Sequence, residues 1–353
     1  MFVRSESPVG LHRVLDPLDD TGSPTVLPQA ARRLDTRSEL WPGEVRIDVE
    51  MLNLDAASYR QLHDKHGGDG AAIRAEVLDI IRTRGKMQNP ATGSGGMLIG
   101  TVAETGPESE LGLTVGQRVA TLVSLSLTPL VVTDELRRWD GLGERVPAEG
   151  HAVLFRRSIA AAIPDDIPSR LALMVMDVCG APALVDRVVR EYTARGIAPT
   201  VCVLGGAGKS GSLSLAAAET AGAGGRIAVV RDDAEADSLG GAGLADRVVV
   251  ADARSPLGLS AAVASAGGPA DITVVCVDVP GCEQPAVLAT AEGGTVIFFS
   301  MATSFAAAAL GAEGLAADVR MLIGNGYVPG HAAYALDLVR ANEEVRRLFE
   351  SRA

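Results

Sequence analysis

Apolar residues in the second half of the chain fall into short unbroken runs that are separated by alanine-rich segments. Five such runs occur, TVCVLGG (200–206), GRIAVVR (225–231), DRVVVADA (246–253), DITVVCVDVP (271–280) and GGTVIFFSMAT (293–303). Strands that are apolar on both faces are typical of a parallel sheet with helices on both sides. The pattern therefore predicts a doubly wound α/β unit from about residue 170 to 325.

The first 160 residues follow a different pattern, in which short β-type segments are broken by glycine and proline. Examples are GEVRIDVEMLNLD (43–55) and MLIGTVAETG (97–106), while residues 112–130 are interpreted as a turn followed by a long strand. A helix is predicted over residues 69–87, and an amphipathic helix over residues 330–349.

These patterns predict two domains in an α/β chain. Residues 1–168 would form an irregular, mostly β domain, and residues 169–327 a doubly wound domain of the kind that binds dinucleotides. The C-terminal helix, residues 328–353, is expected to return to the first domain.

The segment VLGGAGKSGSL (203–213) contains a G-x-G-x-x-G pattern at Gly206, Gly208 and Gly211. A triphosphate P-loop is excluded, because it needs a glycine five positions before the Gly208-Lys209 pair, where Val203 stands. A strand, a glycine turn and a helix N-terminus together form a pyrophosphate site. Gly206 would form the turn, Gly208 would let backbone amides approach, and Gly211 would let the helix pack closely.

Other cofactor residues are expected where the predicted strands end. Ser300 follows the fifth strand, and ligands of parallel sheets bind outside the carboxyl ends of the strands. About 20 positions after the glycine loop, where an acid favours NAD, the chain has Arg231, which can receive the 2′-phosphate of NADP or simply be a solvated charge. NAD and NADP therefore both remain open. The predicted cofactor-binding residues are Gly206, Gly208, Lys209, Ser210, Gly211, Arg231 and Ser300.

Composition narrows the partners and the compartment. A net charge of −12 argues against nucleic acid and suits a cationic substrate. No apolar run approaches the roughly 20 residues that span a bilayer, and the first residues lack the apolar core of a signal peptide. The four cysteines form no C-x-x-C pair, which favours a reducing cytoplasm over a disulfide framework.

The domain order resembles that of the medium-chain dehydrogenase/reductase superfamily, and GLTVGQRV (112–119) resembles its G-D-R-V turn. Where zinc-binding members carry Gly-His-Glu, the chain has Gly93-Ser94-Gly95, and Asn53 stands where a zinc-binding cysteine is expected. The resemblance implies a GroES-like first domain, a Rossmann second domain, a homodimer and no bound metal.

Several longer blocks resemble the L-erythro-3,5-diaminohexanoate dehydrogenase family, from about residue 10 to 350. They include IDVEMLNLDAAS (47–58), GKMQNPATGSGGMLIGTV (85–102), ATLVSLSLTPL (120–130) and GGTVIFFSMATSF (293–305). The resemblance implies oxidative deamination of a small diamino acid with hydride transfer to a nicotinamide dinucleotide, and it points to NAD.

That reaction needs acids facing two ammonium groups, a contact for the carboxylate, and a base. Asp177, inside the apolar stretch LALMVMDVCGAPALV (171–185), is expected to need a cationic partner, since an unpaired buried charge is costly. A structurally paired aspartate is the alternative. Lys86 could bind the carboxylate or act as base with a lowered pKa, and is otherwise a surface charge. The remaining catalytic candidates are Asn53, Asp55 beside it, which could instead bond local backbone, and Glu313 for the distal ammonium.

Two other functions compete with this one. A zinc-free quinone or enone reductase using NADPH would need no acids facing ammonium groups. A non-catalytic dinucleotide sensor would bind cofactor and turn over no amine.

Overall fold

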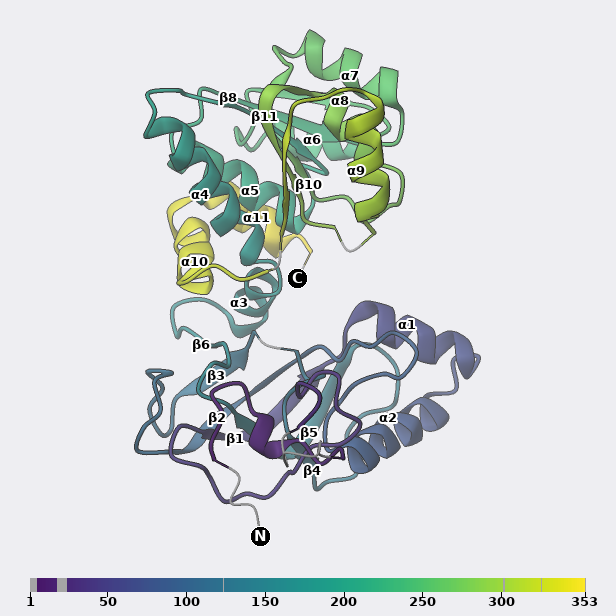
Figure 1. The fold of residues 1–353 in the computed structure, drawn as a ribbon, viewed down its shortest axis with the longest axis vertical. Helices are drawn as coiled ribbons and strands as arrows, with labels where there is room; N and C mark the ends of the chain where they lie inside the picture. The colour runs from purple at the N-terminus through teal and green to yellow at the C-terminus, as the bar shows by residue number, and fades with distance from the viewer. Residues whose placement is uncertain (1–4, 18–23, 123, 301, 325, 353) are drawn as a thin grey trace. The chain divides into compact units, whose positions relative to one another are not determined.

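The computed structural model describes residues 5–17, 24–122, 124–300, 302–324 and 326–352. The chain divides into two compact units, Met1–Pro164 and Asp165–Ala353, which are drawn in Figure 1. The division lies a few residues before the predicted boundary at residue 168.

The first unit is built on an antiparallel sheet of six strands in the order β4-β5-β1-β2-β3-β6. The strands are β1 (Val45–Asn53), β2 (Met97–Thr105), β3 (Arg118–Thr121), β4 (Leu130–Val132), β5 (Arg145–Leu154) and β6 (Ala160–Ala162). The long strand β1 pairs with β2 on one side and β5 on the other, with irregular register near Met51. An irregular, mostly β first unit is therefore confirmed.

Two helices cover part of this sheet, α1 (Ala56–Lys65) and α2 (Gly70–Arg84), and a short 3-10 helix η1 (Leu11–Arg13) precedes them. Ile73, Val77 and Ile80 from α2 join the buried core that the apolar face of β1 forms. Helix α2 starts at Asp69, which accepts hydrogen bonds from two amides of the first turn, and ends at Gly85 in the left-handed conformation. The helix predicted for residues 69–87 is thus confirmed.

The prediction of one long strand within residues 112–130 is wrong. Among the described residues of this range, only β3 and the start of β4 form strands. Leucines alternate with hydroxyl residues in this stretch, as they would in a strand. The hydroxyls bond locally instead: Ser124 Oγ accepts from the Ser126 amide at 3.2 Å, and Thr128 Oγ1 donates to the Ser124 carbonyl at 3.1 Å. Such local bonds give the backbone an alternative to a sheet ladder.

The second unit holds a parallel sheet of six strands in the order β12-β11-β10-β7-β8-β9. The strands are β7 (Thr200–Leu204), β8 (Gly225–Val230), β9 (Arg247–Val250), β10 (Ala270–Val275), β11 (Thr290–Phe298) and β12 (Arg320–Ile323). The first five correspond to the five apolar runs, so the predicted doubly wound unit is confirmed. Strand β12 was missed, because its four residues give too short a signal.

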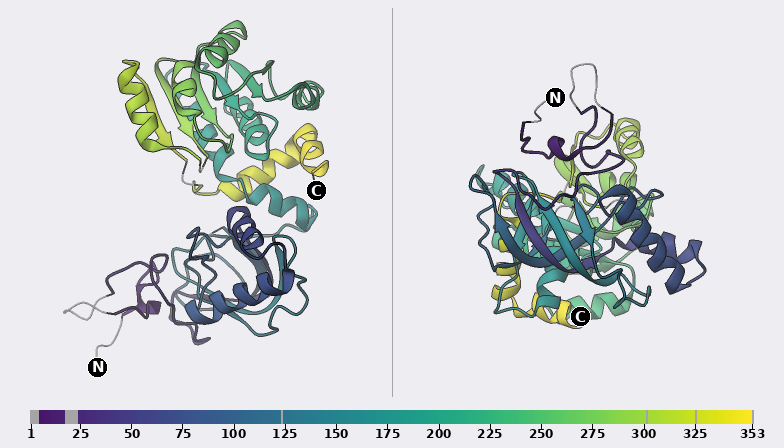
Figure 2. Two further views of the ribbon diagram at one scale, coloured as in Figure 1. Left: turned by 90° about the vertical axis from the view of Figure 1, so that its right-hand side faces the viewer. Right: turned by 90° about the horizontal axis from the view of Figure 1, so that it is seen from below.

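Helices cover both faces of this sheet. The helices of one set pack against one another; they are α4 (Gly180–Thr193), α5 (Lys209–Thr220), α10 (His331–Ala341) and α11 (Glu343–Glu350). Helix α3 (Ser169–Met176) packs against α10 and α11. A second set contains α7 (Pro256–Ser265), α8 (Glu283–Leu288) and α9 (Phe305–Gly314). Figures 1 and 2 show the two sets on opposite faces of the sheet, and α6 (Asp233–Gly240) joins β8 to β9.

The expectation that residues 328–353 return to the first domain differs from the structure. Helices α10 and α11 belong to the second unit, where Tyr334 donates to Asp186 of α4 at 3.0 Å and Arg340 pairs with Asp166. The single predicted helix is also divided, because Asn342 leaves the helical conformation and caps α11 by accepting two amide hydrogens. No helix in the described parts of the chain is long and apolar enough to cross a membrane.

Candidate active site

The glycine loop joins the carboxyl end of β7 to the N-terminus of α5. The left-handed turn residue is Gly205, with φ of +82°, and not Gly206 as the sequence analysis assigned it. A Cβ atom on Gly206 would lie 2.7 Å from the Ala228 Cβ, so this glycine instead allows close packing on β8. The double glycine was the signal that could have identified Gly205.

The other two glycines of the pattern shape the helix start. Gly208 is the N-cap of α5 and provides no side chain to cap the first turn, so the amides there keep their capacity to bind an anion. A Cβ atom on Gly211 would lie 2.1 Å from the Gly205 carbonyl oxygen. The loop therefore has the geometry of a pyrophosphate cradle that side chains would fill.

We expect Gly211→Ala to weaken dinucleotide binding about 10- to 100-fold, because the loop backbone must move away from the new methyl group. Titration calorimetry with NADH measures this effect. Gly240→Ala is the matched control, since Gly240 also lies in a helix but a Cβ there meets nothing within 4 Å. Equal affinities of the two variants would contradict the cradle.

A cleft of about 560 Å³ opens beside this loop, and Gly205 and Gly208 form part of its wall. The ends of β8, β9 and β10 provide the rest, which places the cleft at the carboxyl edge of the sheet, where dinucleotides bind. Its charged lining residues are Arg231, Glu235, Asp252, Arg254 and Asp278. The residues present thus fit an adenine nucleotide.

Arg231 does not face this cleft as a free cation. Its Nε lies 3.0 Å from Asp232 Oδ2 and 3.1 Å from Glu235 Oε1, and its side chain is 79% exposed. Arg254, which the sequence analysis missed, is paired with Asp252 at 2.9 Å. Both guanidinium groups are therefore already neutralised by carboxylates on the rim.

Two further residues at this edge come from other strands and from the C-terminus. Ser300 follows β11 and donates to Asp278 Oδ1 at 3.1 Å, so it lies at the predicted edge, while its contact with nicotinamide stays a prediction. Arg352 donates to the carbonyl of Ala207 inside the glycine loop. Sequence reasoning missed Arg352, since nothing in its local sequence links it to the loop.

Asp177 ends α3 and is half exposed, which corrects the expectation of a buried charge. The apolar residues before and after it belong to two different helices, α3 and α4, and the turn between them exposes the carboxylate. Its partner is Lys209, whose Nζ lies 2.8 Å from Asp177 Oδ2. Lys209 was expected to meet phosphate or solvent, and the structure instead pairs the two candidate residues.

Lys86 is fully buried in the first unit. Its ammonium donates to the carbonyls of Pro28 at 2.7 Å and Gln29 at 2.9 Å. Burial, with a contribution from the positive charge of Arg84, lowers the pKa of Lys86 to about 8. The ammonium is enclosed and donates its hydrogen bonds to backbone carbonyls. These contacts favour a structural role over the predicted contact with a substrate carboxylate.

Asp55 is the N-cap of α1 and accepts from the amides of Ala57 at 3.0 Å and Ser58 at 3.3 Å. This local bonding was the alternative to a catalytic role for Asp55. Asn53, at the end of β1, donates only a long hydrogen bond of 3.4 Å to the carbonyl of Leu54. The described residues contain no group of three or more His, Cys, Asp or Glu that could hold a metal ion.

Glu313 is exposed near the C-terminal end of α9. That end leads to the start of β12, and the Gly293 amide at the start of β11 bonds the nearby Asp318 carbonyl at 2.7 Å. Glu313 therefore lies towards the amino edge of the sheet, opposite the glycine loop. This position argues against the predicted contact with the distal ammonium.

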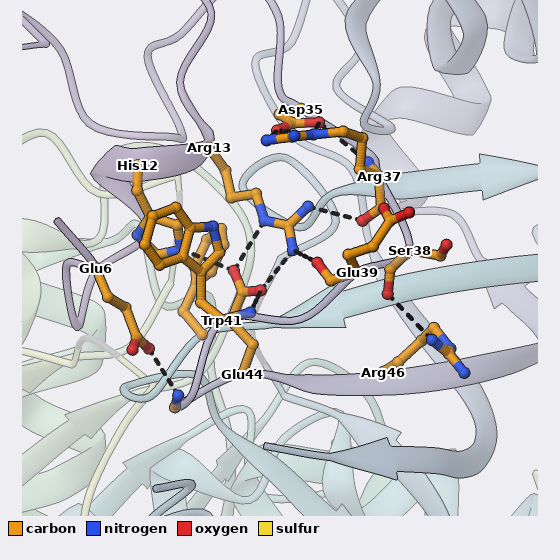
Figure 3. A network of polar contacts seen from close by, with 12 residues as sticks. Glu6, His12, Arg13, Asp35, Arg37, Ser38, Glu39, Trp41, Glu44 and Arg46 are labelled. Carbon is orange, nitrogen blue, oxygen red and sulfur yellow. Dashed lines mark hydrogen bonds and ion pairs between the residues drawn. The ribbon is translucent and has the colours of Figure 1, made fainter. Parts of the chain in front are cut away.

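A separate polar network is buried in the first unit (Figure 3). The Glu44 carboxylate has no exposed surface and accepts from His12 Nε2 at 2.8 Å, from Arg13, and from the Trp41 amide at 2.9 Å. Arg13 also donates to the carbonyls of Arg37 and Glu39, both at 2.7 Å. The network ties the N-terminal segment to the start of β1.

Comparison with known proteins relates this chain to one group. Residues 12–164 match the family described as the L-erythro-3,5-diaminohexanoate dehydrogenase N-terminal domain. An L-erythro-3,5-diaminohexanoate dehydrogenase of Acetoanaerobium sticklandii is 43% identical over 347 residues, covering 97% of each chain. One from Fusobacterium nucleatum is 42% identical over 346 residues, covering 96% of each chain.

Solved structures with a similar fold are more distant in sequence. AibC is 20% identical and has a TM-score of 0.50, with coverage of 89% of this chain and 85% of its own. The alcohol dehydrogenase rspB of E. coli CFT073, in complex with NADH, is 16% identical with a TM-score of 0.50 and coverage of 86% and 83%. At these identities the likeness concerns the fold alone, and the expected GroES-like and Rossmann units are confirmed.

Proposed function

This chain belongs to the L-erythro-3,5-diaminohexanoate dehydrogenase family, and we propose that it oxidatively deaminates L-erythro-3,5-diaminohexanoate. Loss of hydride from C3 leaves an iminium, and water hydrolyses it to give 5-amino-3-oxohexanoate and ammonium. The nicotinamide dinucleotide, when bound, accepts the hydride that leaves C3. Loss of hydride from C3 requires the neutral amine, so a protein group must first take a proton from the C3 ammonium.

The observation that carries this proposal is the position of Asp177 beside the glycine loop. Its carboxylate already binds one ammonium group, that of Lys209, at 2.8 Å. A carboxylate that binds a lysine ammonium offers the same charge and hydrogen-bond geometry to a substrate ammonium. We assign Asp177 to the reacting ammonium, as its counter-ion and as the acceptor of its proton.

The cofactor contacts follow from the geometry of the loop. The uncapped N-terminus of α5 and the glycines 205, 206, 208 and 211 would hold the pyrophosphate. Arg352, which reaches the Ala207 carbonyl, would add positive charge at this place. Ser300, Ser210 and Lys209 complete the set assigned to the cofactor.

The test is growth of the reduced-nicotinamide absorbance with purified enzyme, L-erythro-3,5-diaminohexanoate and either NAD or NADP. Growth with either dinucleotide supports amine oxidation. An enone that is reduced with NADPH, together with no oxidation of the diamine, would overturn the proposal.

In the same assay we expect NAD to exceed NADP in kcat/KM by about tenfold or more. Three carboxylates and two guanidiniums line the cleft, and Asp232 and Glu235 already neutralise Arg231. A 2′-phosphate would bring further negative charge to this rim, whereas ribose hydroxyls can donate to carboxylates. Glu235→Gln should reduce the preference for NAD over NADP, because it removes one of the carboxylates that pair with Arg231. A wild-type enzyme that prefers NADP would contradict this interpretation.

We also propose a homodimer that forms along β12. Among the strands of the described residues this one pairs with β11 alone and thus leaves one edge open, and Ile323 on it is 60% exposed. An exposed apolar edge strand is a template for pairing with a second copy. Ile323→Lys is expected to shift the mass measured by light scattering from that of a dimer to that of a monomer. Val250→Lys, on the opposite edge strand β9, should leave the dimer mass unchanged. A monomeric wild type would refute the interface.

The four free cysteines, three of them buried, support a reducing compartment. We propose that the enzyme acts in the cytoplasm, so cell fractionation should recover its activity in the cytosolic fraction and not in membranes or medium.

A further inference from the structure

The ion pair between Asp177 and Lys209 has an unusual position for a surface pair. Lys209 is the first residue of α5, directly after the N-cap Gly208, so its side chain starts at the pyrophosphate cradle. The two side chains are 50% and 37% exposed, so neither is locked in place by burial. Among the described residues, the Lys209 ammonium donates a hydrogen bond to Asp177 alone.

The segment that carries Asp177 lies at the carboxyl edge of the parallel sheet. On one side Asp177 meets the loop after β7 through Lys209. On the other side Gly180 approaches the segment after β12 so closely that a Cβ would lie 2.5 Å from the Gly326 carbonyl oxygen. Both neighbours follow carboxyl ends of strands, the edge at which α/β sheets bind ligands.

A dinucleotide brings two negative charges to the place where Lys209 begins. A lysine ammonium is a compact charge on a flexible stem and carries three donors, so it can exchange one anion for another. Lys209 occupies Oδ2 of Asp177, and a substrate ammonium brought to the same carboxylate would be repelled by the lysine charge. Lys209 and the substrate ammonium therefore compete for Asp177.

We propose that Lys209 masks Asp177 in the cofactor-free enzyme and moves to the pyrophosphate when the dinucleotide binds. Departure of Lys209 frees Asp177 for the substrate ammonium, which favours binding of the cofactor before the substrate. The identity of the ammonium rests on the proposed function, whereas the exchange of Lys209 between two anions does not.

The first test measures the affinity for NADH by titration calorimetry in a double-mutant cycle. Lys209→Met is expected to weaken NADH binding, because one phosphate contact is lost. Asp177→Asn is expected to tighten it about two- to fivefold, because Lys209 no longer has to leave an exposed ion pair. In the Lys209→Met background, Asp177→Asn should change the affinity for NADH very little.

Asp166→Asn is the matched control for this cycle. It breaks the pair with Arg340, whose side chains are 59% and 37% exposed, and it lies at the other end of α3, roughly 15 Å away. It should leave the affinity for NADH unchanged. If Asp177→Asn tightened NADH binding equally in the wild-type and the Lys209→Met backgrounds, that result would reflect only the loss of a negative charge and would overturn the exchange.

The second test measures binding of L-erythro-3,5-diaminohexanoate with and without NADH, which holds the cofactor site without allowing oxidation. The wild type should bind the diamine at least about tenfold more tightly in the presence of NADH than in its absence. Lys209→Met should lose most of this difference, because it should bind the diamine more tightly than the wild type does in the absence of NADH. Equal affinities of the wild type with and without NADH would overturn the preferred order of binding. Absence of diamine binding in every state would refute the proposed substrate, while the NADH cycle would still decide the exchange.

Discussion

Asp177→Asn is expected to lower kcat by about 100- to 10,000-fold, the range typical of removing a general base. The amide keeps the shape of the side chain but can neither neutralise the substrate ammonium nor accept its proton. Steady-state kinetics with L-erythro-3,5-diaminohexanoate and NAD measure the loss. The fold should be retained, because Asp177 is half exposed and its single ion pair contributes little to stability.

The same variant should bind NADH at least as well as the wild type, so low activity cannot be attributed to a lost cofactor site. Asp166→Asn, with a similarly exposed ion pair in the same unit, should keep nearly full activity. If Asp177→Asn retained more than about a tenth of kcat, the assignment of the proton acceptor to Asp177 would be wrong.

Glu44→Gln is expected to destabilise the first unit by about 3–5 kcal/mol, because it leaves the Arg13 guanidinium buried without a counter-charge. Glutamine preserves the volume of the side chain, so no cavity is created. The loss of stability therefore measures the contribution of the negative charge and of the hydrogen-bond acceptors. Chemical denaturation, followed by a signal from Trp41 in this network, measures the free energy of unfolding. Glu104→Gln, which breaks the exposed pair with Arg46 in the same unit, should cost about 1 kcal/mol at most.

The contribution of Glu44 should depend on pH in a defined direction. Burial opposes its ionisation, but hydrogen bonds from His12 and Arg13 outweigh burial and hold its pKa below the usual 4.5. A depressed carboxyl pKa stabilises the fold above the unfolded value, and this stabilisation disappears as the pH falls through the folded value. The difference in the free energy of unfolding between wild type and Glu44→Gln should thus be constant near neutral pH and shrink below about pH 4.5. A difference that grew in acid would contradict the network.

The sequence predicted the parallel sheet well because the signal there is local. Strands buried on both faces need unbroken apolar runs, and the cofactor loop needs glycines next to a strand and a helix. Steric limits of a single turn fix that spacing, so Gly206, Gly208 and Gly211 could be identified without knowledge of the fold. The same local logic failed over residues 112–130, where hydroxyl side chains bond nearby backbone in place of a strand ladder.

The candidate site was predicted less well, because side-chain roles depend on distant partners. Lys86 and Asp55 are chemically suitable for catalysis, yet one holds the carbonyls of Pro28 and Gln29 and the other caps α1. Glu313 lies near the amino edge of the sheet for a topological reason that no local pattern contains. Arg352, more than a hundred residues from the loop that it contacts, left no signal at all.

By itself, the sequence determined the two kinds of unit and the location of the cofactor loop, since these rest on periodicity and on motifs of a few neighbouring residues. The family followed from the resemblance of longer blocks along the chain. Only the tertiary structure decided that Asp177 meets Lys209, that Glu44 neutralises Arg13, and that the last two helices pack within the second unit. The physical reason is that charges and apolar faces find their partners through the folded chain, where sequence separation has no bearing on distance.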